Sequence, residues 1–334
     1  MNVWARKAGA ALFALIALAA AGASFVAPHP AARQFSDFEY APPMRPHVVG
    51  EDGRWRAPFV YPLRLANRLE RQFLEDRTRP MPLRWFSGGA FVSVDESDGR
   101  PPWLPLGGDP LGRDIFARLI HGARFSLGVS LVAAAAALVL GALLGAVAGF
   151  AGGRVDDIVM RGADFLLVLP AIYVVIVLRG SMPLVLSTVQ VFWIMTAVLT
   201  VVGWPYPARG VRAIVASERR REYAEAARAI GAGPMRILLR HLLPASGGFL
   251  GVQAGLLLPA FILAEATLSF VGFGFAEPTP SWGVMLHDAA QVGTLSEAPW
   301  LLAPAVAIVL TVLAVNLIAG RARPAGAGAR NYSI

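Results

Sequence analysis

The segment RRREYAEAARAIGAGPMRILLRHLLP, Arg219–Pro244, is a polar, arginine-rich stretch between long apolar runs. Charge of this density cannot lie in hydrocarbon, so we predict a loop between membrane spans. No proline interrupts residues 208–230, and Ala, Arg and Glu all favour a helix. Gly231 and Gly233 then permit a break, and Pro234 suits the first position of a second helix. The segment is therefore predicted to be a helix–turn–helix held outside the bilayer.

The composition is typical of a membrane protein. Of 334 residues, 56% are hydrophobic and only 16% are charged, which is too few charges to solvate a soluble domain of this length. The net charge of +8 suits anionic lipid better than nucleic acid. Lys7 is the only lysine, and Ala8 follows it, so no phosphate-binding Gly-Lys-Ser/Thr loop is present and another chain would have to bind ATP. The absence of cysteine excludes disulfides and thiolate sites.

Six apolar runs are each close to the ~20 residues that a helix needs to cross a bilayer core. They cover residues 8–27, 125–150, 162–179, 184–203, 246–270 and 299–320. Arg6 and Lys7 precede the first run, and the loop 205–245 is rich in arginine, so the positive-inside rule places both in the cytoplasm. Six crossings return the carboxyl end to the same side. We expect an all-α, multi-pass integral membrane protein with both termini in the cytoplasm.

These runs divide the chain into four parts. We expect an N-terminal anchor helix at 1–27, an extracytoplasmic segment at 28–122, a five-helix core at 123–320 and a cytoplasmic tail at 321–334. A signal peptide cleaved at Ala21–Ala23 is the alternative for the first run, but the length of its apolar core favours an uncleaved anchor.

The extracytoplasmic segment is the longest polar section. Asn67–Arg77 could form a short amphipathic helix, whereas the many prolines elsewhere favour turns and edge strands. At the end of the segment we expect an interfacial helix with Arg118 at headgroup level. Arg113 could pair with the adjacent Asp114.

Several polar residues are predicted within or next to the spans. Asp157, Arg161 and Asp164 lie at i, i+4 and i+7 on one helix face, where Arg161 can pair with either carboxylate. Packing is favoured over gating as their role. Glu265 lies in the fifth apolar run and must pair, face water or be neutral; we favour a buried structural hydrogen bond over a place in a translocation path. Glycines spaced by four, which let helices pack closely, occur on the second span at Gly141, Gly145 and Gly149.

Four motifs in order resemble one family. Glu225-Ala226-Ala227, followed by Gly231 and Leu243-Pro244, resembles the "EAA loop" of ABC importer permeases, in its dipeptide/oligopeptide/nickel branch. His241 departs from that pattern, which has an aliphatic residue at this position. The other motifs are LPLGGDPLGRD (104–114), VDDIVMRGADFLLVLP (155–170), and FILAEATLSFVGFGF with PTPSWGVML (261–286). The tail AGRARPAGAGARNYSI departs from the acidic ending that is common in this family.

The resemblance implies the type I importer permease fold, with six transmembrane helices and an insertion between helices 1 and 2. It implies a bacterial cytoplasmic (inner) membrane location and four kinds of partner: a second permease subunit in a heterodimer, two ATPase subunits, an extracytoplasmic solute-binding protein, and membrane lipid. ATP and Mg²⁺ would be bound by the ATPase, and no cofactor, metal or catalytic residue is assigned to this chain. The residues implied in ATPase coupling are Tyr223, Ala224, Glu225, Ala226, Ala227, Ile230, Gly231, Gly233, Pro234 and Pro244.

The resemblance favours di- and oligopeptides as the imported substrate, with nickel chelates, glycosides and peptide-like antibiotics as alternatives. Two other functional classes, a secondary transporter and a membrane enzyme, lack their sequence signatures here. A secondary transporter usually carries an internal repeat, and none is visible in this sequence. A membrane enzyme needs a catalytic constellation, and the five histidines form no HExxH pattern.

Overall fold

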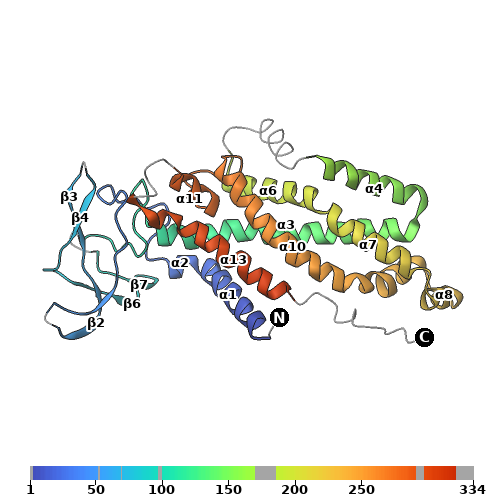
Figure 1. Cartoon of the computed structure of the whole chain (residues 1–334), viewed down its shortest axis with the longest axis horizontal. Coiled ribbons are helices and arrows are strands. Elements are labelled where there is room, and N and C mark those ends of the chain that lie inside the picture. Colours follow the sequence, from blue (N-terminus) through green and yellow to red (C-terminus); the bar gives the residue numbers. More distant parts are fainter. Residues whose placement is uncertain are drawn as a thin grey trace, which may run out of the picture. The chain divides into compact units, whose positions relative to one another are not determined.

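The structure is a computed structural model that describes residues 3–51, 53–68, 70–96, 100–169, 186–290 and 297–320 (Figure 1). The chain forms two compact units. The first, here called the helical unit, comprises Met1–Phe13, Val129–Ile262 and Thr311–Ile334. The second, here called the mixed unit, comprises Ala14–Gly128 and Leu263–Leu310. Each unit is described separately below.

Among the described residues, four helical stretches are long and apolar enough to cross a membrane by length and composition. They are α1 (Val3–Ala21), α3 (Ile115–Ala151), the run Pro234–Phe270 that ends in α10 (Gly247–Phe270), and the run Pro299–Ala319 that ends in α13 (Ala303–Ala319). A fifth candidate is the pair α6 (Thr188–Gly203) and α7 (Pro205–Glu218), bent by 41°. These positions agree with five of the predicted spans. The predicted third span, 162–179, lies mostly outside the described residues, so the count of six stays a prediction.

Close packing of α3 against α7 organises the helical unit. Gly145 on α3 lies so near α7 that an added Cβ would be 2.3 Å from the carbonyl oxygen of Ala208. A Cβ at Gly141 or Gly149 would lie 2.5–2.6 Å from its nearest backbone or side-chain atoms at α7. The glycines spaced by four therefore bring the two helices together, as their spacing predicted.

The segment after α7 contains one more break than the sequence predicted. Instead of one helix up to residue 230, α7 ends at Glu218 and α8 spans Glu222–Ala229. Arg221, the residue before α8, is extended, and Arg219 donates a hydrogen bond of 2.6 Å to the carbonyl oxygen of Phe150 at the end of α3. A tertiary contact thus overrides the helix propensity of the arginines. The chain continues through α9 (Pro234–Ile237), the π-helical turn η2 (Leu238–Leu242) and the 3₁₀ turn η3 (Leu243–Ser246) into α10.

The mixed unit contains β-structure in the segment 28–122, where the prolines predicted turns and edge strands, so the all-α fold class is too broad for this segment. The described part of this unit forms three antiparallel sheets, with the orders β1-β2-β5, β3-β4 and β6-β7. The strands are β1 (His47–Val49), β2 (Trp55–Val60), β3 (Leu63–Asn67), β4 (Gln72–Glu75), β5 (Met81–Pro82), β6 (Arg84–Ser87) and β7 (Ala90–Ser93). Their common core includes Met44, Val60, Leu63, Met81 and Leu104.

The predicted helix at Asn67–Arg77 is instead the second half of the β3–β4 hairpin. Leu63 pairs with Glu75 and Leu65 pairs with Phe73 across it. The alternation of leucine with Arg64 in β3 has the period of two that places every second side chain on one face of a strand. Phe73 packs against the core of the unit, which decides in favour of the strand.

The end of the segment 28–122 leads straight into the long helix α3. No separate interfacial helix forms there, because α3 is continuous from Ile115 to Ala151. Its first residues lie beside α11 (Trp282–Ala289) in an apolar cluster of Ile115, Met285, Ala289 and Leu301. The remaining described helices are α2 (Ala23–Val26), directly after α1, and α4 (Gly153–Val168), directly after α3.

Candidate functional site

The residues predicted to couple to an ATPase all lie in one stretch of the helical unit. Their places are as follows: Tyr223, Ala224, Glu225, Ala226 and Ala227 in α8, Ile230 at its C-cap, Gly231 in the turn, Gly233 and Pro234 at the start of α9, and Pro244 in η3. Gly231 has a φ of +82°, as expected for the break, and Pro234 occupies the first turn of α9. Gly233 is extended with a φ of −66°, so it acts as the N-cap and not as a second left-handed turn.

Two of the alanines of α8 face the interior of the helical unit. Ala224 and Ala227 are buried and lie three residues apart on one side of the helix. They belong to an apolar cluster with Val211 and Val215 of α7 and Leu242 of η2. Because an alanine side chain is a single methyl group, α8 can approach α7 closely. The pair of alanines therefore holds α8 on α7.

The opposite side of the same stretch exposes large apolar side chains. Ile230 is 86% exposed, Met235 is 66% exposed and Tyr223 is 41% exposed. Glu225 and Ala226 are also exposed between them. A group of exposed apolar residues with a charged neighbour is typical of a protein-interaction surface. We refer to Tyr223, Glu225, Ile230 and Met235 as the α8 surface.

Ion pairs join α7 to α4 in a pattern that the sequence predicted only in part. Arg212 on α7 donates from Nε to both carboxylate oxygens of Asp156, at 2.8 and 3.1 Å, and these hydrogen bonds lower the pKa of Asp156. Among the described residues, Asp164 forms its ion pair with Arg209 of α7. Arg161 was expected to pair with Asp157 or Asp164 along α4, whereas Asp164 pairs with a residue of the neighbouring helix α7. Asp156, beside the predicted Asp157, was missed.

Glu265 on α10 is completely buried in the mixed unit. The hydroxyl of Ser269 donates to Oε1 of Glu265 at 2.8 Å, one turn further along the helix. Ser126 of α3 and Ser281 also lie beside the Glu265 side chain, whose Oε2 has no hydrogen-bond partner among the described residues. This is the buried hydrogen-bonded arrangement that the sequence favoured. Its role in transport stays a prediction.

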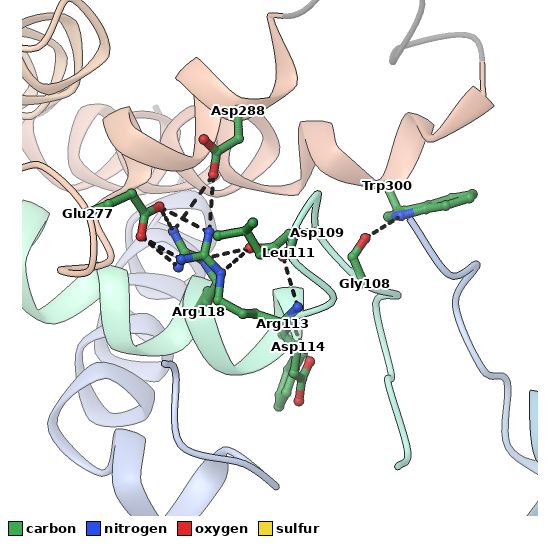
Figure 2. A network of polar contacts seen from close by, with 10 residues as sticks. Gly108, Asp109, Leu111, Arg113, Asp114, Arg118, Glu277, Asp288 and Trp300 are labelled. Atoms are coloured by element: carbon green, nitrogen blue, oxygen red, sulfur yellow. Dashed lines mark hydrogen bonds and ion pairs between the residues drawn. The ribbon is translucent and has the colours of Figure 1, made fainter. Parts of the chain in front are cut away.

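A second polar cluster, which the sequence did not predict, surrounds the start of α3 (Figure 2). Arg118 is fully buried, and its Nη2 lies 2.7 Å from Oε1 of Glu277. Arg113 binds the same carboxylate and also lies 2.6 Å, through Nε, from Oδ2 of Asp109. Asp288 of α11 completes the group, at 3.6 Å from Arg113 and 3.8 Å from Arg118. We call these five residues the arginine cluster.

Charge in the arginine cluster is not fully balanced, because three carboxyl groups face two guanidinium groups. Burial opposes ionisation of Glu277, but hydrogen bonds from Arg113 and Arg118 outweigh it and lower the pKa of Glu277. For Asp288, burial dominates over the attraction of Arg118 and raises its pKa to about 6. Contrary to the sequence-based expectations, Arg118 does not lie at a headgroup surface, and Arg113 does not pair with its neighbour Asp114.

Asp114 instead binds a buried histidine. His29 Nδ1 lies 2.9 Å from Oδ2 of Asp114, and its Nε2 lies 2.5 Å from Oε1 of Glu96. Burial alone would lower the pKa of His29, but hydrogen bonds with Asp114 and Glu96 raise it to about 9. Burial raises the pKa of Asp114. Nothing in the local sequence singles out His29, because its partners come from distant parts of the chain.

Comparison with known proteins places this arrangement in a family. The family model described as "Binding-protein-dependent transport system inner membrane component" matches residues 137–323, more than half of the chain. The matched range contains α7, α8, α9 and the glycines that hold α7 to α3.

Individual curated proteins agree. The chain is 36% identical over 241 residues to the oligopeptide transport system permease protein OppC of Bacillus subtilis, covering 72% of this chain and 76% of that protein. It is 42% identical over 215 residues to the dipeptide transport system permease protein DppC of the same organism, covering 64% and 65%. It is 37% identical to the di/tripeptide transport system permease protein DppC of Pseudomonas aeruginosa, covering 67% and 74%. This chain therefore belongs to the family of binding-protein-dependent transport system inner membrane components, which are multi-pass transport subunits and not enzymes.

Proposed function

We propose that this chain is the transmembrane permease subunit of an ATP-driven importer, and that the α8 surface docks on an ATPase subunit. The observation that carries the proposal is the two-sided character of this stretch: Ala224 is fully buried while Ile230 is 86% exposed. The buried alanines of α8 pack in the chain's own core, and the exposed residues present apolar side chains next to the carboxylate of Glu225. Such a surface fits a groove on a partner protein.

The route by which docking could move the membrane spans follows from the contacts behind α8. Ala224 and Ala227 fix α8 to α7 through the apolar cluster with Val211 and Val215. The glycine contacts fix α7 to α3, and the Arg212–Asp156 ion pair fixes it to α4. A displacement of α8 would therefore be passed on to α7 and to the helices packed on it. We propose that this movement alternates access to the substrate path.

The proposed assembly has further partners, in line with the family. A second permease subunit would complete the translocation path as a heterodimer, two ATPase subunits would bind ATP and Mg²⁺, and an extracytoplasmic binding protein would deliver the solute. The arginines around α8 favour a cytoplasmic position for the α8 surface. The same rule, with six spans, places both termini in the cytoplasm and the β-stranded segment 28–122 outside.

Di- and oligopeptides are the proposed substrate class. Support comes from the relatives, which are named as permeases for oligopeptides, dipeptides and di/tripeptides. Nickel chelates, glycosides and peptide-like antibiotics stay alternatives. Uptake measured with a labelled dipeptide, a nickel chelate and a glycoside would distinguish these classes.

The test of the docking proposal is a charge reversal on the α8 surface. Glu225→Arg is expected to abolish ATP-driven uptake in proteoliposomes that contain the complete transporter, while membrane insertion of the chain is retained. Binding of the ATPase should weaken by about 2 kcal/mol, or roughly 30-fold, as at an interface hot spot. The matched control is Glu70→Arg, an exposed glutamate in the turn between β3 and β4, which should transport normally. Normal uptake and ATPase binding with Glu225→Arg would refute the docking role.

A further inference from the structure

Four aromatic side chains form an exposed group in the mixed unit. Phe25 follows α1, and Trp85, Phe86 and Phe91 lie on the β6–β7 hairpin. Their exposed fractions are 46%, 53%, 71% and 39%. The rings of Phe25 and Phe91 lie 5.9 Å apart, and those of Phe86 and Phe91 lie 5.3 Å apart. We call this group the aromatic patch. Contiguous exposed apolar surface of this kind marks a site that contacts a protein or a membrane.

The position of the aromatic patch relative to α1 decides between these two contacts. The apolar run that follows Arg6 and Lys7 covers residues 8–27, and 20 helical residues span about 30 Å, the thickness of a bilayer hydrocarbon core. Leu15 and Leu18, in the second half of α1, are 66% and 70% exposed, so this face of α1 is open to lipid. Phe25 lies only four residues after the last residue of α1, Ala21, at the level where the hydrocarbon ends.

The aromatic patch lies directly after α1 in the chain and in space. Helical hydrogen bonds run on past the end of α1, from Gly22 N to Leu18 O and from Val26 N to Gly22 O, both at 2.9 Å. Gly22, with a φ of −86° and a ψ of 20°, interrupts the helix between α1 and α2, so Phe25 lies in a separate short helix directly after α1. The β6–β7 hairpin packs against α2, and Figure 1 shows β6 and β7 beside α2. Phe25 of α2 and the hairpin therefore form one aromatic group directly after α1.

The hairpin itself displays its aromatic residues and does not bury them. Its turn consists of Gly88 and Gly89, both with positive φ, which suits the twist of a tight hairpin. Phe86, next to the turn, has a φ of +55°, a conformation that a bulky residue rarely adopts. This conformation fills no core, because Phe86 is the most exposed ring of the four. Its consequence is to hold an apolar ring outward at the tip of the hairpin.

We propose that the aromatic patch inserts into the interfacial region of the bilayer at the end of α1 and anchors the β6–β7 hairpin on phospholipid. Phenylalanine and tryptophan suit this site because their rings are apolar enough for the acyl-chain boundary, and tryptophan prefers the membrane interface. Elements that lie on a membrane bury their apolar side about 5–10 Å into the boundary between headgroups and acyl chains. The inference concerns lipid contact alone, and it holds whatever solute the chain transports and on whichever side of the membrane the patch lies.

The absence of native cysteine allows a direct depth measurement. A nitroxide is attached to Phe86→Cys in the full-length chain, reconstituted in phospholipid vesicles. Its collisions with molecular oxygen, which concentrates in hydrocarbon, are compared with its collisions with a water-soluble nickel chelate. Leu18→Cys on α1 serves as the lipid-exposed reference. Leu74→Cys on β4, 64% exposed among charged neighbours, serves as the water-exposed reference.

The expected result is that the label at residue 86 is protected from the chelate and accessible to oxygen, as at residue 18, with a depth of about 5–10 Å below the headgroups. Trp85→Cys should give the same result, so that a local defect at one position cannot decide the outcome. Chelate access equal to that at residue 74 would overturn the proposal. Protection from both reagents would also overturn it, because that result indicates a protein contact.

Discussion

The two ends of α3 are fixed to their surroundings by opposite kinds of interaction. In the helical unit, the glycines at 141–149 have no side chain, and α7 packs directly on the α3 backbone. In the mixed unit, the start of α3 carries the fully buried Arg118, which is surrounded by carboxylates of the arginine cluster. The attachment in the helical unit depends on glycines that lack a side chain, and the attachment in the mixed unit depends on buried charged side chains.

The two attachments differ in what perturbs them. Close packing is sensitive to added volume and insensitive to pH, because no ionisable group takes part. A buried charge cluster tolerates little loss of a partner, since the remaining charges would stay desolvated without compensation. Variants of each kind can therefore test whether the stability of the chain divides in this way.

The largest effect is expected when Arg118 is replaced. Arg118→Leu leaves Glu277 and Asp109 with one guanidinium in place of two. The free energy of unfolding should fall by about 3–5 kcal/mol, the range for breaking a buried ion pair on one side. Denaturant titration of the chain in mild detergent measures the change.

An exposed ion pair provides the control for that experiment. Arg68 and Asp37 lie 3.8 Å apart, with side chains that are 75% and 66% exposed. Arg68→Leu should change the free energy of unfolding by less than about 1 kcal/mol, because water screens such pairs. If Arg118→Leu and Arg68→Leu lower the free energy of unfolding equally, the arginine cluster does not stabilise the chain through buried, desolvated ion pairs.

His29 is expected to make a smaller contribution to the free energy of unfolding, and this contribution depends on pH. Its pKa is raised from 6.5 to about 9 in the folded chain. A raised pKa means that the folded state holds the proton more tightly, so this stabilisation is complete below pH 6.5 and is lost as the pH rises through 9. The loss should amount to about 3 kcal/mol, from 1.36 kcal/mol per pKa unit. Unfolding followed from pH 6 to pH 10 measures it, and His29→Gln should flatten this part of the curve. A slope unchanged by His29→Gln would assign the pH dependence to other groups.

Sequence reasoning succeeded where the deciding signal is local. The spacing of Gly141, Gly145 and Gly149 predicted close packing without reference to the partner helix. The apolar runs predicted α1, α3, α6, α10 and α13 because a bilayer sets the length of a spanning helix. In the candidate site, Gly231 and Pro234 were placed correctly, since their backbone preferences are intrinsic to those residues.

It failed where partners are distant in the chain. Arg113 and Glu277 are separated by 164 positions, so the sequence indicates that each needs a partner but not which one. The break between α7 and α8 likewise depends on a hydrogen bond from Arg219 to the end of α3. At residues 67–77, good helix formers concealed a strand whose apolar side chain is held by tertiary packing.

The last prediction concerns the glycine attachment and has the smallest expected effect on stability. Gly145→Leu adds a side chain whose first atom would lie 2.3 Å from the carbonyl oxygen of Ala208, so α7 must move away from α3. Such overpacking typically costs about 1–3 kcal/mol, which thermal unfolding in detergent can detect. Gly162→Leu on α4 is the matched control, because nothing lies within 4 Å of an added Cβ there. If both variants unfold at the same temperature, α3 and α7 are not held by close backbone contact. If only Gly145→Leu is destabilised, and to the same extent at pH 6 and pH 9, the attachment is steric and independent of the charges that fix the start of α3.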